Sequence, residues 1–248
     1  MTELRRVASA ELLKLKRTLA LRLAFAAPLL IVLLQLGVYL ARGEQFTHGS
    51  DNPIAGFVRG IVTLWTLLLL PFYATLAAAL VASLDHQEHH WDQLFALPIH
   101  RWTIFAAKWI AVTSLVILSS ATLPVYALLA AQVVKLRLHA SAGNPFPLGL
   151  LLDNVARSCA AALLLISIQM WFSLRWRSFV LALAIGIAGI MSGIILISAP
   201  LPFLSLYPWT APGAAASPTH PPLALAWGLF AGLALGVASC RQLAQRDG

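Results

Sequence analysis

The stretch that decides the fold is residues 178–199, SFVLALAIGIAGIMSGIILISA, which contains no charged residue and no histidine. About 20 apolar residues in a helix are enough to cross the hydrocarbon core of a bilayer. The rest of the chain has the same character, because 60% of its 248 residues are hydrophobic and only 10% are charged. This composition excludes a soluble globular domain.

Five further stretches are long and apolar enough to cross a membrane. We predict six spans, at about residues 19–41, 60–84, 105–134, 150–174, 178–199 and 223–241. Little of the chain remains for a soluble part, so residues 1–248 are expected to form a single all-α transmembrane domain. At the start of the fourth span, near Leu150, Asp153 and Arg157 stand one turn apart and are able to pair.

Basic residues gather on one side of this layout. Six spans place both termini on the same side, and most of the 17 lysines and arginines fall there. Because such residues favour the cytoplasmic side, both termini are expected in the cytoplasm, with the chain in a bacterial inner membrane. The net charge of +8 then follows from this topology, and the basic residues can contact anionic lipid. No basic domain is present that would indicate nucleic-acid binding.

The segments outside the spans have distinct compositions. Residues 1–18 are charged and amphipathic, which predicts a helix lying in the membrane interface. Residues 200–222 contain seven prolines. Since proline interrupts helices, we expect this segment to form an external loop without a helix. Within the spans, Pro28, Pro71 and Pro124 can each kink a helix.

The centres of the predicted spans contain no Asp, Glu, Lys, Arg or His. This argues against transport driven by a coupling ion, which needs a ligand near the midplane. The mild polar residues there either line a substrate pathway or hydrogen-bond between helices. The pathway candidates are Gln35, Thr63, Thr66 and Gln169.

No enzyme motif is evident. The spans offer no nucleophile with a partner base, and the chain has no Gly-rich loop to hold a nucleotide phosphate. We therefore predict that the chain is not an enzyme and that any energy for work against a gradient comes from another chain.

The densest polar segment is residues 85–101, DHQEHHWDQLFALPIHR. Asp85 can cap a helix with Trp91 and Leu94 on its apolar side and an acidic row on the other, and Pro98 would end it. We expect a short amphipathic helix over residues 85–97, at the cytoplasmic surface between spans two and three. On these properties alone, the helix either meets another protein or simply lies on the membrane.

This segment resembles the permease subunits of ABC transporters of the ABC-2 type. In that family an acidic residue is followed by a short helix, a Leu-x-x-Leu-Pro-Ile/Val-x-Arg-like element and a lysine one or two turns into the next span. The matching positions are Glu88, residues 94–101 and Lys108. Residues 11–18 resemble the interfacial helix that precedes span one in the family. Residues 91–94 are most similar to the branch that exports, or confers immunity to, bacteriocins, lantibiotics and bacitracin-like peptides.

The resemblance implies a permease that works as a dimer with a second copy or a paralogue. Its coupling helix, residues 85–97, would dock on a separate ATP-binding subunit. That subunit would hold ATP and Mg, with no cofactor in this chain. The implied cargo is an amphipathic peptide, drug or lipid-like molecule, carried outward, and the implied biological role is antimicrobial peptide resistance. The coupling residues implied are Asp85, Glu88, Trp91, Asp92, Leu94, Leu97, Pro98 and Arg101.

Three alternatives stay open from the residues. The cargo could be haem or a polysaccharide, or the chain could be a non-transporting scaffold or sensor that recruits a partner through the same helix. His86, His89 and His90 have a spacing that can place imidazoles on one helix face. A structural zinc site needs four closed ligands, so we predict no metal site here.

Overall fold

The computed structural model describes residues 2–47, 52–86, 100–137, 145–176, 178–197, 204–217 and 221–246. Within these ranges the chain is helical and has no strand. Six helical segments are long and apolar enough to cross a membrane, which confirms the predicted all-α, six-span membrane protein. They are Leu19–Arg42, Pro53–Leu84, Arg101–Arg137, Leu148–Arg175, Phe179–Ile197 and Pro222–Gln242.

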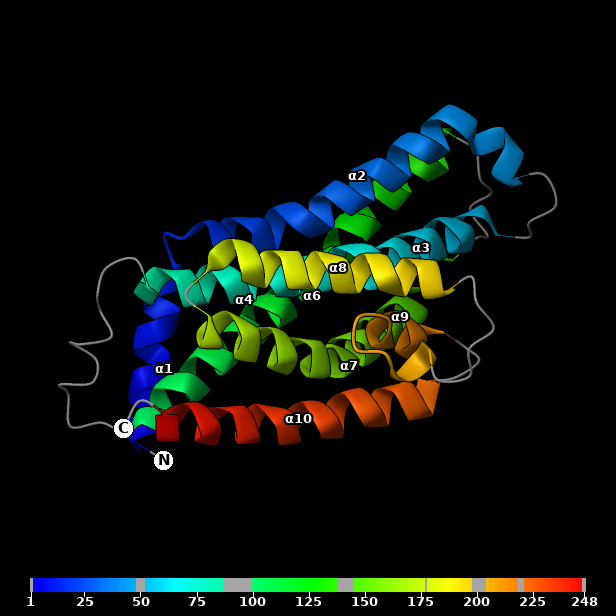
Figure 1. Ribbon diagram of the computed structural model, residues 1–248. Helices are drawn as coiled ribbons and strands as arrows, with labels where there is room; N and C mark the ends of the chain where they lie inside the picture. The colour runs from blue at the N-terminus through cyan, green and yellow to red at the C-terminus, as the bar shows by residue number, and fades with distance from the viewer. Residues whose placement is uncertain are drawn as a thin grey trace.

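The long helices lie side by side, and α1 crosses one end of the bundle beside both termini (Figure 1). We call this the terminal end and the opposite one the far end. The elements are α1 (Thr2–Leu15), α2 (Leu19–Thr47), α3 (Pro53–Leu64), η1 (Trp65–Leu69), α4 (Leu70–His86), α6 (Arg101–Arg137), α7 (Leu148–Arg175), α8 (Phe179–Ile197), η2 (Leu204–Leu206), α9 (Ala211–Ala216) and α10 (Pro221–Arg246).

The second span consists of α3, η1 and α4 in succession. Its middle piece, η1, is a π-helix, and the backbone N–H of Leu70 donates to the carbonyl of Trp65. Pro71 follows directly; it has no N–H, and its ring would collide with the carbonyl of Leu67 in a regular α-helix. The wider π turn accommodates this carbonyl. Pro28 and Pro124, in contrast, lie inside α2 and α6 without a change of helix type.

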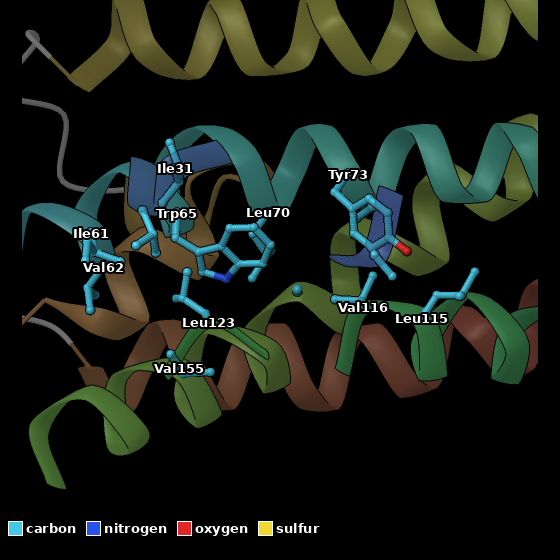
Figure 2. Packing of buried hydrophobic residues seen from close by; sticks show 14 of the residues in the cluster. Ile31, Ile61, Val62, Trp65, Leu70, Tyr73, Leu115, Val116, Leu123 and Val155 are labelled. Carbon is cyan, nitrogen blue, oxygen red and sulfur yellow. The ribbon is translucent and has the colours of Figure 1, made fainter. Parts of the chain in front are cut away.

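The core forms where the second span meets α2, α6 and α7. Trp65 and Tyr73 are among its largest buried side chains. Figure 2 shows Trp65 close to Leu70 and Leu123. The Tyr73 hydroxyl donates to the carbonyl of Ala20 at 3.0 Å, which joins α4 to α2.

Two glycines let α10 approach α7 closely. A Cβ at Gly228 would lie 2.5 Å from the Cα of Ala161, and one at Gly232 would lie 2.5 Å from the backbone nitrogen of Leu164. These glycines are four residues apart, a spacing that favours close helix packing in membranes. Because the two helices are this close, the Ser167 hydroxyl of α7 can donate to the carbonyl of Gly232 in α10, at 2.7 Å.

The expectation that residues 200–222 form no helix was wrong. Residues 211–216 form α9, with Pro212 in its first turn, where the missing N–H would have had no partner in any case. The preceding residues turn back onto the bundle. The Tyr207 hydroxyl lies 2.7 Å from that of Ser192 and donates to the carbonyl of Gly189 in α8. The segment is therefore partly folded into the far end.

Other boundaries shift by a few residues. The second span begins at Pro53 rather than near residue 60, because Asn52 caps α3 by accepting the N–H of Ala55 at 3.1 Å. The fourth begins at Leu148. The predicted pairing at its start is confirmed, since Arg157 Nε lies 2.9 Å from Asp153 Oδ1.

We expect Gly232→Ala to lower the free energy of unfolding by about 1–3 kcal/mol, because the new methyl group would collide with the backbone of α7 and push α10 away from it. Gly37→Ala is the matched control, since no atom lies within 4 Å of a Cβ at that position. Thermal unfolding of both variants in one mild detergent measures the difference. Equal stability of the two variants would contradict the close approach of α7 and α10.

Candidate functional site at the terminal end

The predicted coupling segment lies mostly outside the described residues. Residues 87–99 belong to that part, so the coupling roles of Glu88, Trp91, Asp92, Leu94, Leu97 and Pro98 stay predictions. His89 and His90 lie there too, so the prediction that they form no metal site also stays a prediction. Asp85 and His86 are the last residues of α4, and their side chains lie outside the described set. Among the described residues, no cluster of His, Cys, Asp or Glu could hold a metal ion.

The structure does describe what flanks this segment. α4 ends at His86, and α6 begins at Arg101. Arg101, the last of the predicted coupling residues, is therefore the first residue of α6, and its side chain is half-buried. α1 packs against α6 at this end.

A buried ion pair fixes α1 to α6. Lys108 is only 1% exposed, and its Nζ lies 3.1 Å from Oε2 of Glu11, which is 5% exposed. The other oxygen of Glu11 lies 2.9 Å from Nζ of Lys14. A charge removed from water is costly unless it is paired, so Glu11 allows the ammonium of Lys108 to lie inside the protein.

A second contact joins the beginnings of the same helices. The backbone N–H of His100 donates to Oε1 of Glu3 at 2.8 Å, and Nδ1 of His100 lies 3.2 Å from Oε2. The hydrogen bond from the His100 N–H holds the pKa of Glu3 below its usual range. This contact is thus fully present above the usual carboxyl pKa and is lost as the pH falls through the lowered value.

The two contacts are in register. Glu3 meets residue 100 and Glu11 meets residue 108, so equal lengths of chain separate the two points on both sides. Eight helical residues correspond to about 12 Å of axis. α1 and the start of α6 are therefore attached at two points and can move as one unit.

The sequence analysis did not predict that Glu3 contacts His100 or that Glu11 pairs with Lys108. A signal was present, however, because a lysine in the first turns of a membrane span needs an anionic partner nearby. The motif identified Lys108, and α1 carries two glutamates. Only the fold shows that Glu11, 97 positions earlier, is the partner.

The four pathway candidates separate into two groups. Gln169 is fully buried, and its Nε2 donates to the carbonyl of Ala182 in α8 at 2.5 Å. Gln35 lies on Gly60 of α3, where a Cβ would overlap its amide. Both glutamines therefore occupy helix contacts. Thr63 and Thr66 instead line a cavity of about 690 Å³ at the far end, together with Arg59.

A comparison of the chain with models of known protein families finds a match to one family. The family model described as ABC-2 family transporter protein matches residues 8–193, which include α1 from residue 8 and the whole segment between α4 and α6. No curated protein and no solved structure matches the chain.

We expect Glu11→Gln to lower the free energy of unfolding by about 3–5 kcal/mol, because it removes a carboxylate 3.1 Å from the buried ammonium of Lys108. The double variant Glu11→Gln/Lys108→Met should recover much of this loss. Lys14→Met is the control and should cost less than about 1 kcal/mol, since this partner is 42% exposed. Thermal unfolding in detergent compares the variants. A Glu11→Gln variant as stable as Lys14→Met would contradict the structural role of the pair.

Proposed function

The chain belongs to the ABC-2 family of transporter proteins, and from this premise we propose that it is the permease subunit of an ATP-driven exporter whose ATP is hydrolysed by a separate subunit. The family match over residues 8–193 carries the proposal. The six apolar helices support it, since they make the chain a multi-pass membrane protein.

In the proposed orientation, the terminal end faces the cytoplasm of a bacterium and the far end faces outward. The distribution of basic residues supports this. Arg5, Arg6 and Arg17 are exposed in or next to α1, and Arg175 and Arg241 are exposed near the terminal ends of α7 and α10. Basic residues are enriched on the cytoplasmic side of inner-membrane proteins.

Residues 85–97 are the proposed contact with the ATP-binding subunit, which would also hold ATP and Mg. Their position supports this role, because they connect the second span to the third at the end where α1 lies. A displacement of this segment would act directly on α4 and on α6. Through Glu3 and Glu11 it would also move α1, because both glutamates contact residues at the start of the third span.

We further propose that two permease chains, identical or paralogous, form the pathway, and that the cargo is an amphipathic peptide, drug or lipid-like molecule. The resemblance of residues 91–94 to the bacteriocin and lantibiotic branch supports this class of cargo. Low burial of α2, α8 and α10 within one chain supports association, since these helices leave apolar side chains for lipid or a second copy.

Purification from the native membrane in mild detergent tests the proposal. We expect a soluble subunit to co-purify and to hydrolyse ATP in a vanadate-sensitive way, with stimulation by cargo. A chain that is purified without any ATPase, under conditions that preserve related complexes, would contradict the permease function and favour a scaffold or sensor.

Glu88→Ala and Leu94→Asp should leave membrane insertion intact but reduce cargo-stimulated ATP hydrolysis by at least about tenfold, because each alters the proposed docking surface. Glu44→Ala and Leu136→Asp are matched controls at the far end. The measurement is ATPase activity of the reconstituted complex beside the yield of inserted chain. Full transport by both docking variants would contradict the coupling assignment.

A further inference from the structure

We propose that the cavity at the far end binds the anionic headgroup of an amphipathic molecule, that is, a phosphate or carboxylate attached to an apolar chain. We call it the far-end cavity. It lies between α3, η1, α7 and α9 and has a volume of about 690 Å³. This is within the range of small-molecule sites in proteins.

The charged groups of the far-end cavity favour an anion. Arg59 and Arg157 line it together with a single carboxylate, that of Asp153. Arg157 contacts this carboxylate through Nε, which leaves its terminal N–H groups for another acceptor. Arg59 makes no ion pair within the described part of the chain. The lining thus carries one positive charge in excess, on a side chain suited to bidentate contact with an oxyanion.

The cavity also has uncharged hydrogen-bonding groups and an apolar part. The hydroxyl of Thr63 and the amide of Asn154 can complete the contacts of an oxyanion, whereas the Thr66 hydroxyl already donates to the carbonyl of Thr63. The apolar lining comes from Val62, Leu67, Leu150 and Ala216. A ligand with a charged head and an aliphatic chain satisfies both parts, whereas a free inorganic anion would leave the apolar part without a partner.

The π-helical segment forms part of the wall. Thr66 and Leu67 belong to η1, and π segments are frequent at functional sites. Gly213 of α9 lies against Leu67, and a Cβ at this glycine would collide with the leucine side chain. The absence of a side chain at Gly213 therefore allows α9 to pack directly on η1.

Hydrogen bonds hold the walls in place. Asn52 Nδ2 donates to the carbonyl of Pro145 at 3.4 Å, which joins the residues preceding α3 and α7. The Ser158 hydroxyl donates to the carbonyl of Pro212 at 3.0 Å and joins α9 to α7. A site whose walls are fixed before binding loses less entropy when the ligand enters.

The proposal goes beyond the proposed function, because it does not require ATP or a partner subunit. The same headgroup chemistry occurs in a bilayer lipid and in an amphipathic cargo. Binding to the chain alone therefore tests the site, whatever the outcome for transport.

The experiment titrates dodecyl phosphate onto the purified chain in a neutral maltoside detergent and follows the heat of binding. We expect saturable binding with one site per chain. Arg59→Gln should weaken it by about fivefold to tenfold, and Arg59→Lys should restore part of the loss. Asp153→Asn should strengthen it, because it removes the negative charge and releases Arg157.

Arg137→Gln is the control, since this arginine is also exposed at the far end but does not line the cavity. An unchanged affinity in both Arg59→Gln and Asp153→Asn would overturn the proposal, and so would an equal loss of affinity in Arg137→Gln.

A second experiment places the chain in nanodiscs and repeats the titration with dodecyl phosphate. Loss of dodecyl phosphate binding in phosphatidylglycerol discs, but not in phosphatidylcholine discs, identifies a lipid headgroup as the occupant. Retained binding in both indicates an amphipathic cargo.

Discussion

The position of α1 depends on the need of one buried ammonium for a carboxylate. Lys108 lies just past the second turn of α6 and is almost fully enclosed. Its charge cannot stay there without a counter-charge, and Glu11 supplies it. Because Glu11 lies in the C-terminal half of α1, this helix must cross the terminal end of the bundle instead of lying apart in the interface. The contact of Glu3 with His100 then sets its direction.

The far end is held together by different forces. There the described ion pair, Arg157 with Asp153, lies within one helix, and contact between helices comes from close packing, as with α9, whose Gly213 lies against the Leu67 side chain of η1. Within the Pro-rich segment, residues 204–217 fold onto the bundle because Tyr207 finds hydrogen-bond partners in α8. Hydrocarbon gives no drive for apolar helices to associate, so small residues and interhelical hydrogen bonds take over this role. The bundle thus has a charged attachment at one end and a close-packed one at the other.

The second span connects the two ends. α4 begins at the π segment, whose residues line the far-end cavity, and it ends at the segment proposed to meet the ATP-binding subunit. π turns sit at positions where a helix departs from its regular hydrogen bonding, and Pro71 lacks the N–H of a regular turn here. A permease has to pass a movement from one membrane face to the other. Under the proposed function, a shift at the terminal end of α4 would reach the cavity wall through a single continuous element.

The sequence by itself determined the six spans, the helical class and the pairing of Asp153 with Arg157, because hydropathy and spacing within one helix are local properties. It also indicated the family. Only the tertiary structure decided that Lys108 meets Glu11, that Gln35 and Gln169 lie in helix contacts, and that Thr63 and Thr66 share a cavity with Arg157. Each of these depends on which helices become neighbours and how they are rotated. In an apolar bundle that choice is made by packing between distant segments, which the periodicity of a single helix does not encode.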